Sequence, residues 1–204
     1  MNFLRSPRLH EYDLVVAHFK NYDPDTPGRS GYDNLAKFVQ QGGGLIVVHF
    51  ACGAFQEFQD DFVTLAGRVW NPKFRGHDRY GEFTVEPTVA DHPITRGLGP
   101  FKTTDELYTC LDGSTPITVL ARARSVVDEK FYPMAFVLHY GQGRVFHTPL
   151  GHDVAALGNP STAELLRRAA AWTCGLEVSP GKPEPDVLSG AGKISTSPSN
   201  QNPP

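Results

Sequence analysis

The end of one predicted hairpin carries two residues that could do chemistry. Two apolar runs, 134–140 and 144–150, flank the turn residues 141–143, and this pattern predicts a β-hairpin. The second run is followed directly by Gly151, His152 and Asp153. An imidazole beside a carboxylate can transfer protons or bind a metal ion, and α/β proteins place such groups where strands end in loops. We therefore take His152 and Asp153 as candidates for a functional site.

A second histidine, His49, lies at the end of another strand pattern. Residues 45–50 form a continuous apolar run rich in Val and Ile, which is typical of a strand covered on both faces. A histidine at its carboxyl end could serve as acid, base or metal ligand in the crevice outside the sheet. The alternative is a structural core histidine. The tight turn predicted over 51–53 favours the functional interpretation.

Carboxylates and a phenol come together in residues 103–108. Glu106 and Tyr108 would share one face if this segment is extended. A carboxylate near His49 or His152 could act as a base or complete a metal site made of nitrogen and oxygen ligands. An exposed acidic turn is the alternative interpretation.

The polar loop 74–77 contributes Arg75 and His77. An arginine can bind an anion or a sugar hydroxyl, and the histidine can act as a ligand, an acid or a base. Taken alone, the segment is better interpreted as a solvated loop.

The three cysteines, Cys52, Cys110 and Cys174, are odd in number and far apart. This argues against a disulfide framework or a cysteine zinc site, and for a reducing compartment. Cys52 follows a predicted strand, but Phe50, two residues earlier, is too large for a nucleophile elbow. We interpret Cys52 as a small buried thiol.

The elements that must position these residues alternate in the first half of the chain. The pattern predicts a strand over 12–18, a helix around 32–39 that ends at the glycines 42–44, the strand 45–50, and a helix around 55–65. This order implies a parallel sheet with right-handed crossovers. The second half is less regular, with strands predicted at 82–87 and 116–122, the hairpin, and a helix opened by a capping box at 161–164.

Length and composition favour one globular domain, since the 204 residues are 40% hydrophobic and 20% charged. The formal net charge of -3 shows no excess of basic residues, so the composition does not favour binding to nucleic acid. The sequence predicts no transmembrane helix and no signal peptide, so we take a cytoplasmic location as the default expectation. Pro, Gly, Ser and Asn dominate from residue 179 onward, which predicts a domain over 1–178 and a disordered tail over 179–204.

Several of these motifs, taken in order, resemble one family. They are GGGLIVVH at 42–49, FRGH at 74–77, DHPITRGL at 91–98, DELY at 105–108, and the hairpin through GHD at 140–153. Together, over about residues 12–176, they resemble the trehalose-utilisation, or ThuA-like, family. The resemblance implies an α/β fold: a flavodoxin-like three-layer sandwich of the class I glutamine amidotransferase-like type, with a mostly parallel sheet. Only eleven residues precede the first predicted strand, so the chain looks short of that fold's first strand and helix.

The resemblance also implies a role in carbohydrate metabolism, acting on trehalose or a keto-sugar. Its matching positions form the expected pocket: His49, Arg75, His77, Glu106, Tyr108, His152 and Asp153. Our leading hypothesis is a sugar isomerase, epimerase or lyase, not an amidotransferase. His49, His152 and Glu106 would be catalytic, with His49 and His152 working as acids and bases or holding a divalent metal, while Arg75, His77, Tyr108 and Asp153 bind the sugar.

Two alternatives belong to other classes of protein. One is a non-catalytic sugar-binding or regulatory module, which predicts sugar binding that survives loss of His152. The other is a cysteine hydrolase or amidotransferase using Cys52, which predicts rapid alkylation of that thiol at neutral pH. The expected partner is a small-molecule sugar, without nucleic acid or membrane, and the sequence leaves assembly into a homo-oligomer open.

Overall fold

The protein is described by a computed structural model that covers residues 2–19 and 26–179. Apart from Ser179, the predicted tail 179–204 lies outside these described residues. None of the helices in the two described ranges is long and apolar enough to span a membrane.

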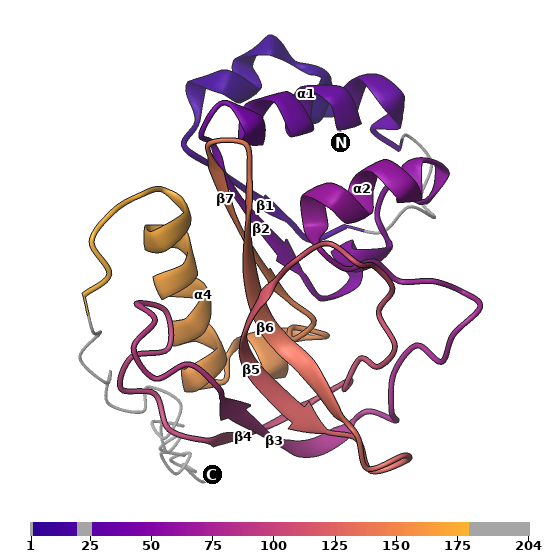
Figure 1. The fold of residues 1–204 in the computed structure, drawn as a ribbon, viewed down its shortest axis with the longest axis vertical. Helices are drawn as coiled ribbons and strands as arrows, with labels where there is room; N and C mark the ends of the chain where they lie inside the picture. Colours follow the sequence, from indigo (N-terminus) through magenta and orange to yellow (C-terminus); the bar gives the residue numbers. More distant parts are fainter. Residues whose placement is uncertain (1, 20–25, 180–204) are drawn as a thin grey trace, which may run out of the picture.

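Within residues 2–19 and 26–179, seven strands form one mixed sheet in the order β1-β2-β7-β6-β5-β3-β4 (Figure 1). Their bounds are β1 Leu14–Ala17, β2 Gly44–Val48, β3 Gly81–Pro87, β4 Phe101–Asp105, β5 Thr118–Arg124, β6 Phe131–Tyr140 and β7 Gly143–Thr148. The pairs β1–β2 and β2–β7 are parallel, and the other four pairs are antiparallel.

The fold is therefore α/β, as expected, but the prediction of a mostly parallel sheet is wrong. The physical reason lies in the connections. The strands β5, β6 and β7 follow one another through short turns, and a short turn can join only antiparallel neighbours. The long crossovers that parallel pairing requires occur around β1 and β2, where helices separate the strands.

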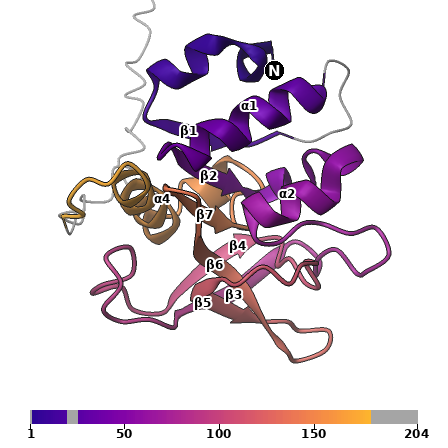
Figure 2. The same cartoon turned by 45° about the horizontal axis from the view of Figure 1, so that its top comes forward.

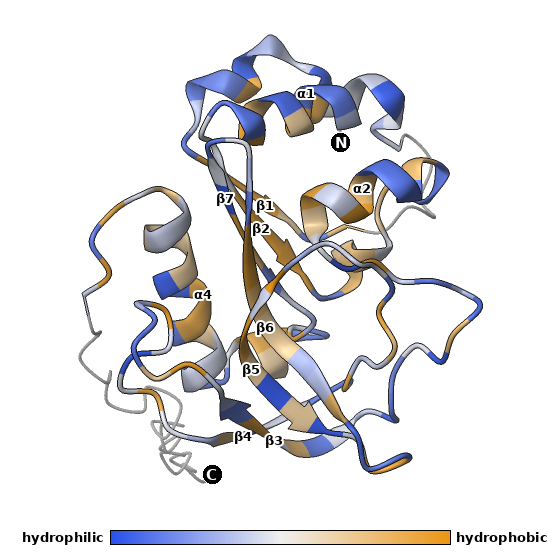
Figure 3. Cartoon of the chain, in the orientation of Figure 1, coloured by the Kyte–Doolittle hydropathy of each residue, from blue (hydrophilic) through white to orange (hydrophobic). Residues whose placement is uncertain are grey.

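Helices cover both faces of the parallel part of the sheet (Figures 1 and 2). The helices α1 (Gly28–Gln40) and α2 (Gln59–Ala66) contribute to one core cluster, and α4 (Pro160–Thr173) contributes to the other. Side chains alternate along β2, so Leu45 and Val47 join the first cluster while Ile46 and Val48 join the second. All five residues of β2 are buried, which confirms the predicted strand covered on both faces, and β2 is coloured as apolar in Figure 3.

Two local details complete the framework. Residues 2–11 form two short 3-10 helices, Asn2–Arg5 and Pro7–Glu11, that pack against α1. The helix predicted to open with a capping box at 161–164 begins two residues earlier: its N-cap is Asn159 instead of Ser161, and the Asn159 side chain accepts hydrogen bonds from the N–H groups of Ser161 and Thr162.

The strand β4, which the sequence did not predict, lies at the far edge of the sheet, and β3 is its only partner among the described strands. Its last residue, Asp105, nevertheless accepts hydrogen bonds from the backbone N–H groups of Gly151 (2.7 Å) and His152 (3.1 Å). These two residues follow β7, which is separated from β4 by three strands in the sheet order. The sheet is therefore curled enough for the end of β4 to meet the loop after β7.

Candidate functional site

Three strand ends meet at one place and bring predicted residues together. His49 follows β2, His152 lies in the loop after β7, and Glu106 follows β4. The strands β2 and β7 are parallel neighbours, so their carboxyl ends lie at the same edge of the sheet. The curl of the sheet supplies the third residue from β4.

Glu106 is the centre of this group. Its Oε2 atom lies 3.5 Å from His49 Nε2 and 3.2 Å from His152 Nδ1. Its other oxygen, Oε1, lies 3.7 Å from His77 Nε2. One ligand atom from each of His49, Glu106 and His152 can be chosen so that all three atoms lie within 4.8 Å of one another. We call these three residues the His-Glu-His cluster.

His49 is held in an unusual state for a histidine. It begins the 3-10 helix His49–Gly53 with φ of +47°, a left-handed conformation that is uncommon for residues other than glycine and that often marks functional sites. The side chain is buried, and its Nε2 atom makes no hydrogen bond within the described residues. Burial, reinforced by the charges of nearby histidines, lowers the pKa of His49 to about 3. The imidazole is therefore neutral at pH 7.

Asp105 lies beneath the cluster and is completely buried. It accepts three backbone hydrogen bonds: from Gly151 at Oδ2, and from Glu106 (2.8 Å) and His152 at Oδ1. Burial raises the pKa of this carboxyl, although the three N–H groups act in the opposite direction. This carboxylate directly precedes Glu106 in the sequence, but the sequence pattern alone assigned it no role.

His77 and Tyr108 form the wall beside His49. The two residues pair through an isolated β-bridge, and their ring centroids are 5.4 Å apart. The buried Tyr108 ring also contacts His49, at 4.9 Å between centroids. The Nδ1 atom of His77 lies 2.8 Å from the carbonyl oxygen of Asp78, so this nitrogen donates and Nε2 is directed toward Glu106.

Asp153 and Tyr80 lie on the other side of the cluster. Asp153 Oδ1 caps the short helix α3 (Val154–Leu157) by accepting from the N–H of Ala156, and Oδ2 accepts from the Tyr80 hydroxyl at 2.8 Å. These two hydrogen bonds lower the pKa of Asp153. The Tyr80 ring lies 5.3 Å from the His152 ring and is 44% exposed. Sequence analysis missed Tyr80, whose only signal is its place just before a predicted strand.

Arg75 has a different set of contacts from the one expected. Its guanidinium pairs with Asp78 Oδ1 and Asp128 Oδ2, both at 3.1 Å, and donates to Ser125 Oγ. These contacts tie the loop before β3 to the turn between β5 and β6. The structure thus brings together six of the seven predicted residues and leaves Arg75 in a separate ion-pair network.

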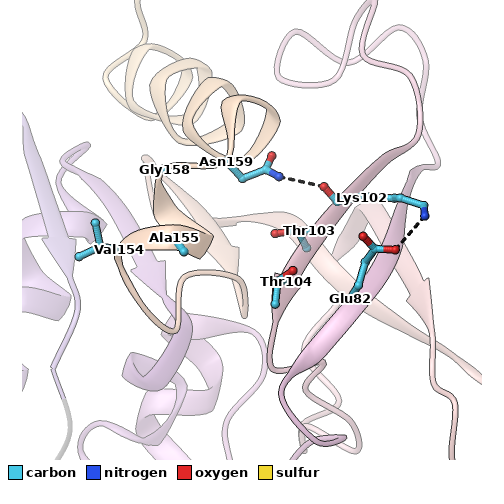
Figure 4. Close-up of a pocket in the computed structure, with 8 residues that line it drawn as sticks. All are labelled: Glu82, Lys102, Thr103, Thr104, Val154, Ala155, Gly158 and Asn159. Atoms are coloured by element: carbon cyan, nitrogen blue, oxygen red, sulfur yellow. Dashed lines mark hydrogen bonds and ion pairs between the residues drawn. The ribbon is translucent and has the colours of Figure 1, made fainter. Parts of the chain in front are cut away.

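A groove of about 580 Å³ lies between β4 and α3 (Figure 4). Two of its lining residues are sequence neighbours of site residues. Thr104 directly precedes Asp105, and Val154 directly follows Asp153. The complete lining is Glu82, Lys102, Thr103, Thr104, Val154, Ala155, Gly158 and Asn159.

Cys52 has the environment of a structural residue. It is buried in the 3-10 helix after β2, and burial raises the pKa of its thiol to about 12. A thiol with so high a pKa carries almost no thiolate at neutral pH and is a poor nucleophile. The structure therefore agrees with the interpretation of Cys52 as a buried thiol.

Comparison with known proteins places the chain in a family. The family model for ThuA, described as trehalose utilisation, matches residues 2–173. A ThuA-like protein from Parabacteroides merdae ATCC 43184 is 25% identical with a TM-score of 0.74, over 86% of this chain and 75% of that chain. A ThuA-like protein from Bacteroides uniformis ATCC 8492 is 21% identical with a TM-score of 0.66, over 81% and 71%.

A third solved structure, a cytoplasmic protein from Salmonella typhimurium LT2, shares the fold at 16% identity and a TM-score of 0.57, over 82% of this chain and 71% of that chain. No curated protein matches. Because the family model spans the β-sheet and every residue of the His-Glu-His cluster, the chain belongs to the ThuA, or trehalose-utilisation, family.

Proposed function

We propose that this protein is an enzyme of carbohydrate metabolism that holds a divalent metal ion with His49, Glu106 and His152 and acts on a sugar or keto-sugar. The observation that carries the proposal is the convergence of two imidazoles and one carboxylate from three separate strand ends. The description of the family as trehalose utilisation supports a sugar as the substrate.

The donor atoms fit a metal ion in kind and in spacing. Two histidines and a glutamate form a set that suits zinc, manganese or iron, and catalytic zinc sites use the same set. Ligands about 2.1 Å from an ion in tetrahedral geometry lie about 3.4 Å from one another. The separations of Glu106 Oε2 from His49 Nε2 (3.5 Å) and from His152 Nδ1 (3.2 Å) agree with that spacing.

The state of His49 favours the role of ligand over that of acid or base. A metal ligand must be a neutral imidazole, and the low pKa of His49 keeps it neutral. A buried nitrogen without a hydrogen bond is costly, and a metal ion would give Nε2 a partner. A group with a pKa of about 3 is also poorly matched to proton transfer at neutral pH.

The ion would supply Lewis-acid polarisation of a sugar carbonyl or hydroxyl. Among the chain's own residues, His77 is placed to move the proton: 39% of its side chain is exposed, and its Nδ1 atom is anchored on the Asp78 carbonyl. Proton removal next to a carbonyl begins isomerisation, epimerisation and elimination alike, and we include all three reactions in the proposal.

The groove between β4 and α3 provides space for the sugar. Its volume of about 580 Å³ falls within the range of small-molecule pockets. Lys102 and Glu82 line the groove and form an exposed ion pair. Exposed ion pairs contribute little stability, so both side chains can instead form hydrogen bonds with sugar hydroxyls. The half-exposed ring of Tyr80 lies beside His152, with 5.3 Å between the ring centroids, where it can pack against a sugar ring.

A titration of the metal-free protein with Zn²⁺ by calorimetry tests the proposal. We expect one ion per chain, and at least a hundredfold weaker binding in His152→Ala. The matched control is His139→Ala, because His139 is exposed at the end of β6 and packs on Trp172, away from the cluster. Equal zinc affinity in wild type and His152→Ala would refute the proposed site.

The groove also supports a second candidate, a sugar-binding module without catalysis, because none of the groove-lining residues belongs to the cluster. This candidate predicts that a sugar binds equally well to wild type and to His152→Ala, with or without Zn²⁺. A sugar affinity that depends on both the metal and His152 would favour the enzyme.

A further inference from the structure

Asp105 contacts the backbone of the site rather than the proposed ion. Its two carboxylate oxygens accept three N–H groups, from Glu106, Gly151 and His152, at 2.7–3.1 Å. Its Oδ1 atom also lies 4.0 Å from His49 Nε2. One buried side chain therefore touches the segments that carry all three members of the His-Glu-His cluster.

The hydrogen bonds of Asp105 cross a gap that strand pairing does not close. The strand β4 is an edge strand, and three strands separate it from β7 in the sheet order. Glu106 comes from the β4 side and His152 from the β7 side. Their separation therefore depends on how tightly the end of β4 is fixed to the loop after β7.

We infer that Asp105 is the positioning residue of the site: it fixes Glu106 and His152 at the separation that lets them share one metal ion. The inference rests on the proposed metal site. In this role Asp105 contacts neither the ion nor the substrate. Both carboxylate oxygens of Asp105 stay hydrogen-bonded to backbone N–H groups.

The pattern of donors explains why this role needs a carboxylate. Three N–H groups point at two oxygens, and an ionised carboxylate accepts at both. Asparagine has nearly the same shape but only one oxygen, and its NH2 group is a donor that would face another donor. Asp105→Asn therefore leaves the volume unchanged and breaks at least one of the links.

Asp78 offers a matched control. It is also buried (4% exposed), and its carboxylate pairs with the Arg75 guanidinium (3.1 Å) and accepts hydrogen bonds from Ser125 Oγ (3.0 Å) and the Val126 N–H (2.9 Å). These bonds hold the turn between β5 and β6, not the segments that bear Glu106 and His152. Asp78→Asn makes the same chemical change in a buried carboxylate without touching the link between β4 and β7.

The experiment is a Co²⁺ titration of wild type, Asp105→Asn and Asp78→Asn, followed by visible absorption, with thermal unfolding measured on the same samples. We expect Asp105→Asn to bind Co²⁺ at least tenfold more weakly and with an altered spectrum. We expect Asp78→Asn to lose thermal stability but to keep the wild-type spectrum and affinity. A folded Asp105→Asn protein with wild-type Co²⁺ binding overturns the inference, as does an equal loss of binding in Asp78→Asn.

A second measurement needs no variant. Amide hydrogen exchange of metal-free wild type should show protection at Gly151 and His152, because their N–H groups are bonded to Asp105. Unprotected exchange at both amides overturns the inference even if Asp105→Asn does not fold. Wild-type protein that binds no Co²⁺ refutes the proposed function and this inference with it, whereas binding that is unaffected by Asp105→Asn refutes the inference alone.

Discussion

Two buried histidines should make the fold sensitive to mild acid. His49 and His147 are 3% and 0% exposed, and burial lowers their pKa values to about 3 and about 4. In the unfolded chain both would titrate near 6.5. Below that pH the unfolded state binds two protons that the native state does not, so the free energy of unfolding must fall as the pH falls.

The magnitude follows from these pKa values. Between pH 7 and pH 5 each histidine should remove about 2 kcal/mol of stability, or about 4 kcal/mol together. Asp105 acts in the opposite direction, because a carboxyl whose pKa is raised in the native state favours folding as the pH falls. Variants that remove one histidine at a time separate the histidine contributions from this offset.

The assay is urea unfolding of metal-free protein at pH 7 and pH 5, for wild type, His49→Asn and His147→Asn. In His147→Asn, the amide keeps a donor near the position of Nδ1, which lies 2.9 Å from the Ala66 carbonyl oxygen. In His49→Asn, asparagine tolerates the left-handed backbone conformation of position 49. Each variant should lose about 2 kcal/mol less stability than wild type on acidification. The control His139→Asn should behave as wild type does.

An equal loss of stability in His147→Asn and wild type between pH 7 and pH 5 would contradict this prediction. That result would mean that His147 takes up its proton in the folded protein, which is incompatible with a fully buried ring bonded to a carbonyl.

Three further predictions concern the metal, the thiol and a close backbone contact. Zn²⁺ at a hundred times its dissociation constant should raise the free energy of unfolding of wild type by about 2.7 kcal/mol in urea titrations, and should have little effect on His152→Ala. Cys52 should stay unmodified by iodoacetamide at neutral pH in the folded protein and react in urea, because it is buried with a pKa raised to about 12; rapid labelling in peptide maps would revive the cysteine hydrolase hypothesis. Gly143→Ala should destabilise the fold by about 1–3 kcal/mol in urea unfolding, because its Cβ would lie 2.1 Å from the Val39 carbonyl oxygen. Gly99→Ala, where a Cβ meets nothing within 4 Å, should be close to neutral.

The sequence predicted those parts of the site that depend on local patterns. The run 45–50 identified a strand buried on both faces, and therefore placed His49 at a strand end. The glycine turn at 141–143 identified the hairpin of β6 and β7, and this placed His152 in the loop that follows. The parallel pairing of β2 with β7, which the local patterns did not predict, brings the two histidines to the same edge of the sheet.

The parts that the sequence did not predict depend on long-range contacts. The strand β4 has Phe101 as its only apolar residue, and its buried positions are Thr103 and Asp105, so hydrophobic alternation gives no signal. The partners of Arg75 lie 3 and 53 residues away, and no spacing rule identifies the distant one. Burial of Asp105 follows from the curl of the sheet, which is a property of the whole fold.

A crystal structure of the protein grown with Zn²⁺, with diffraction data collected on both sides of the zinc absorption edge, tests the metal site directly. We expect an anomalous peak about 2.0–2.2 Å from His49 Nε2, His152 Nδ1 and a Glu106 oxygen. Fully occupied zinc elsewhere, with His49 Nε2 still lacking a partner in the cluster, would contradict it.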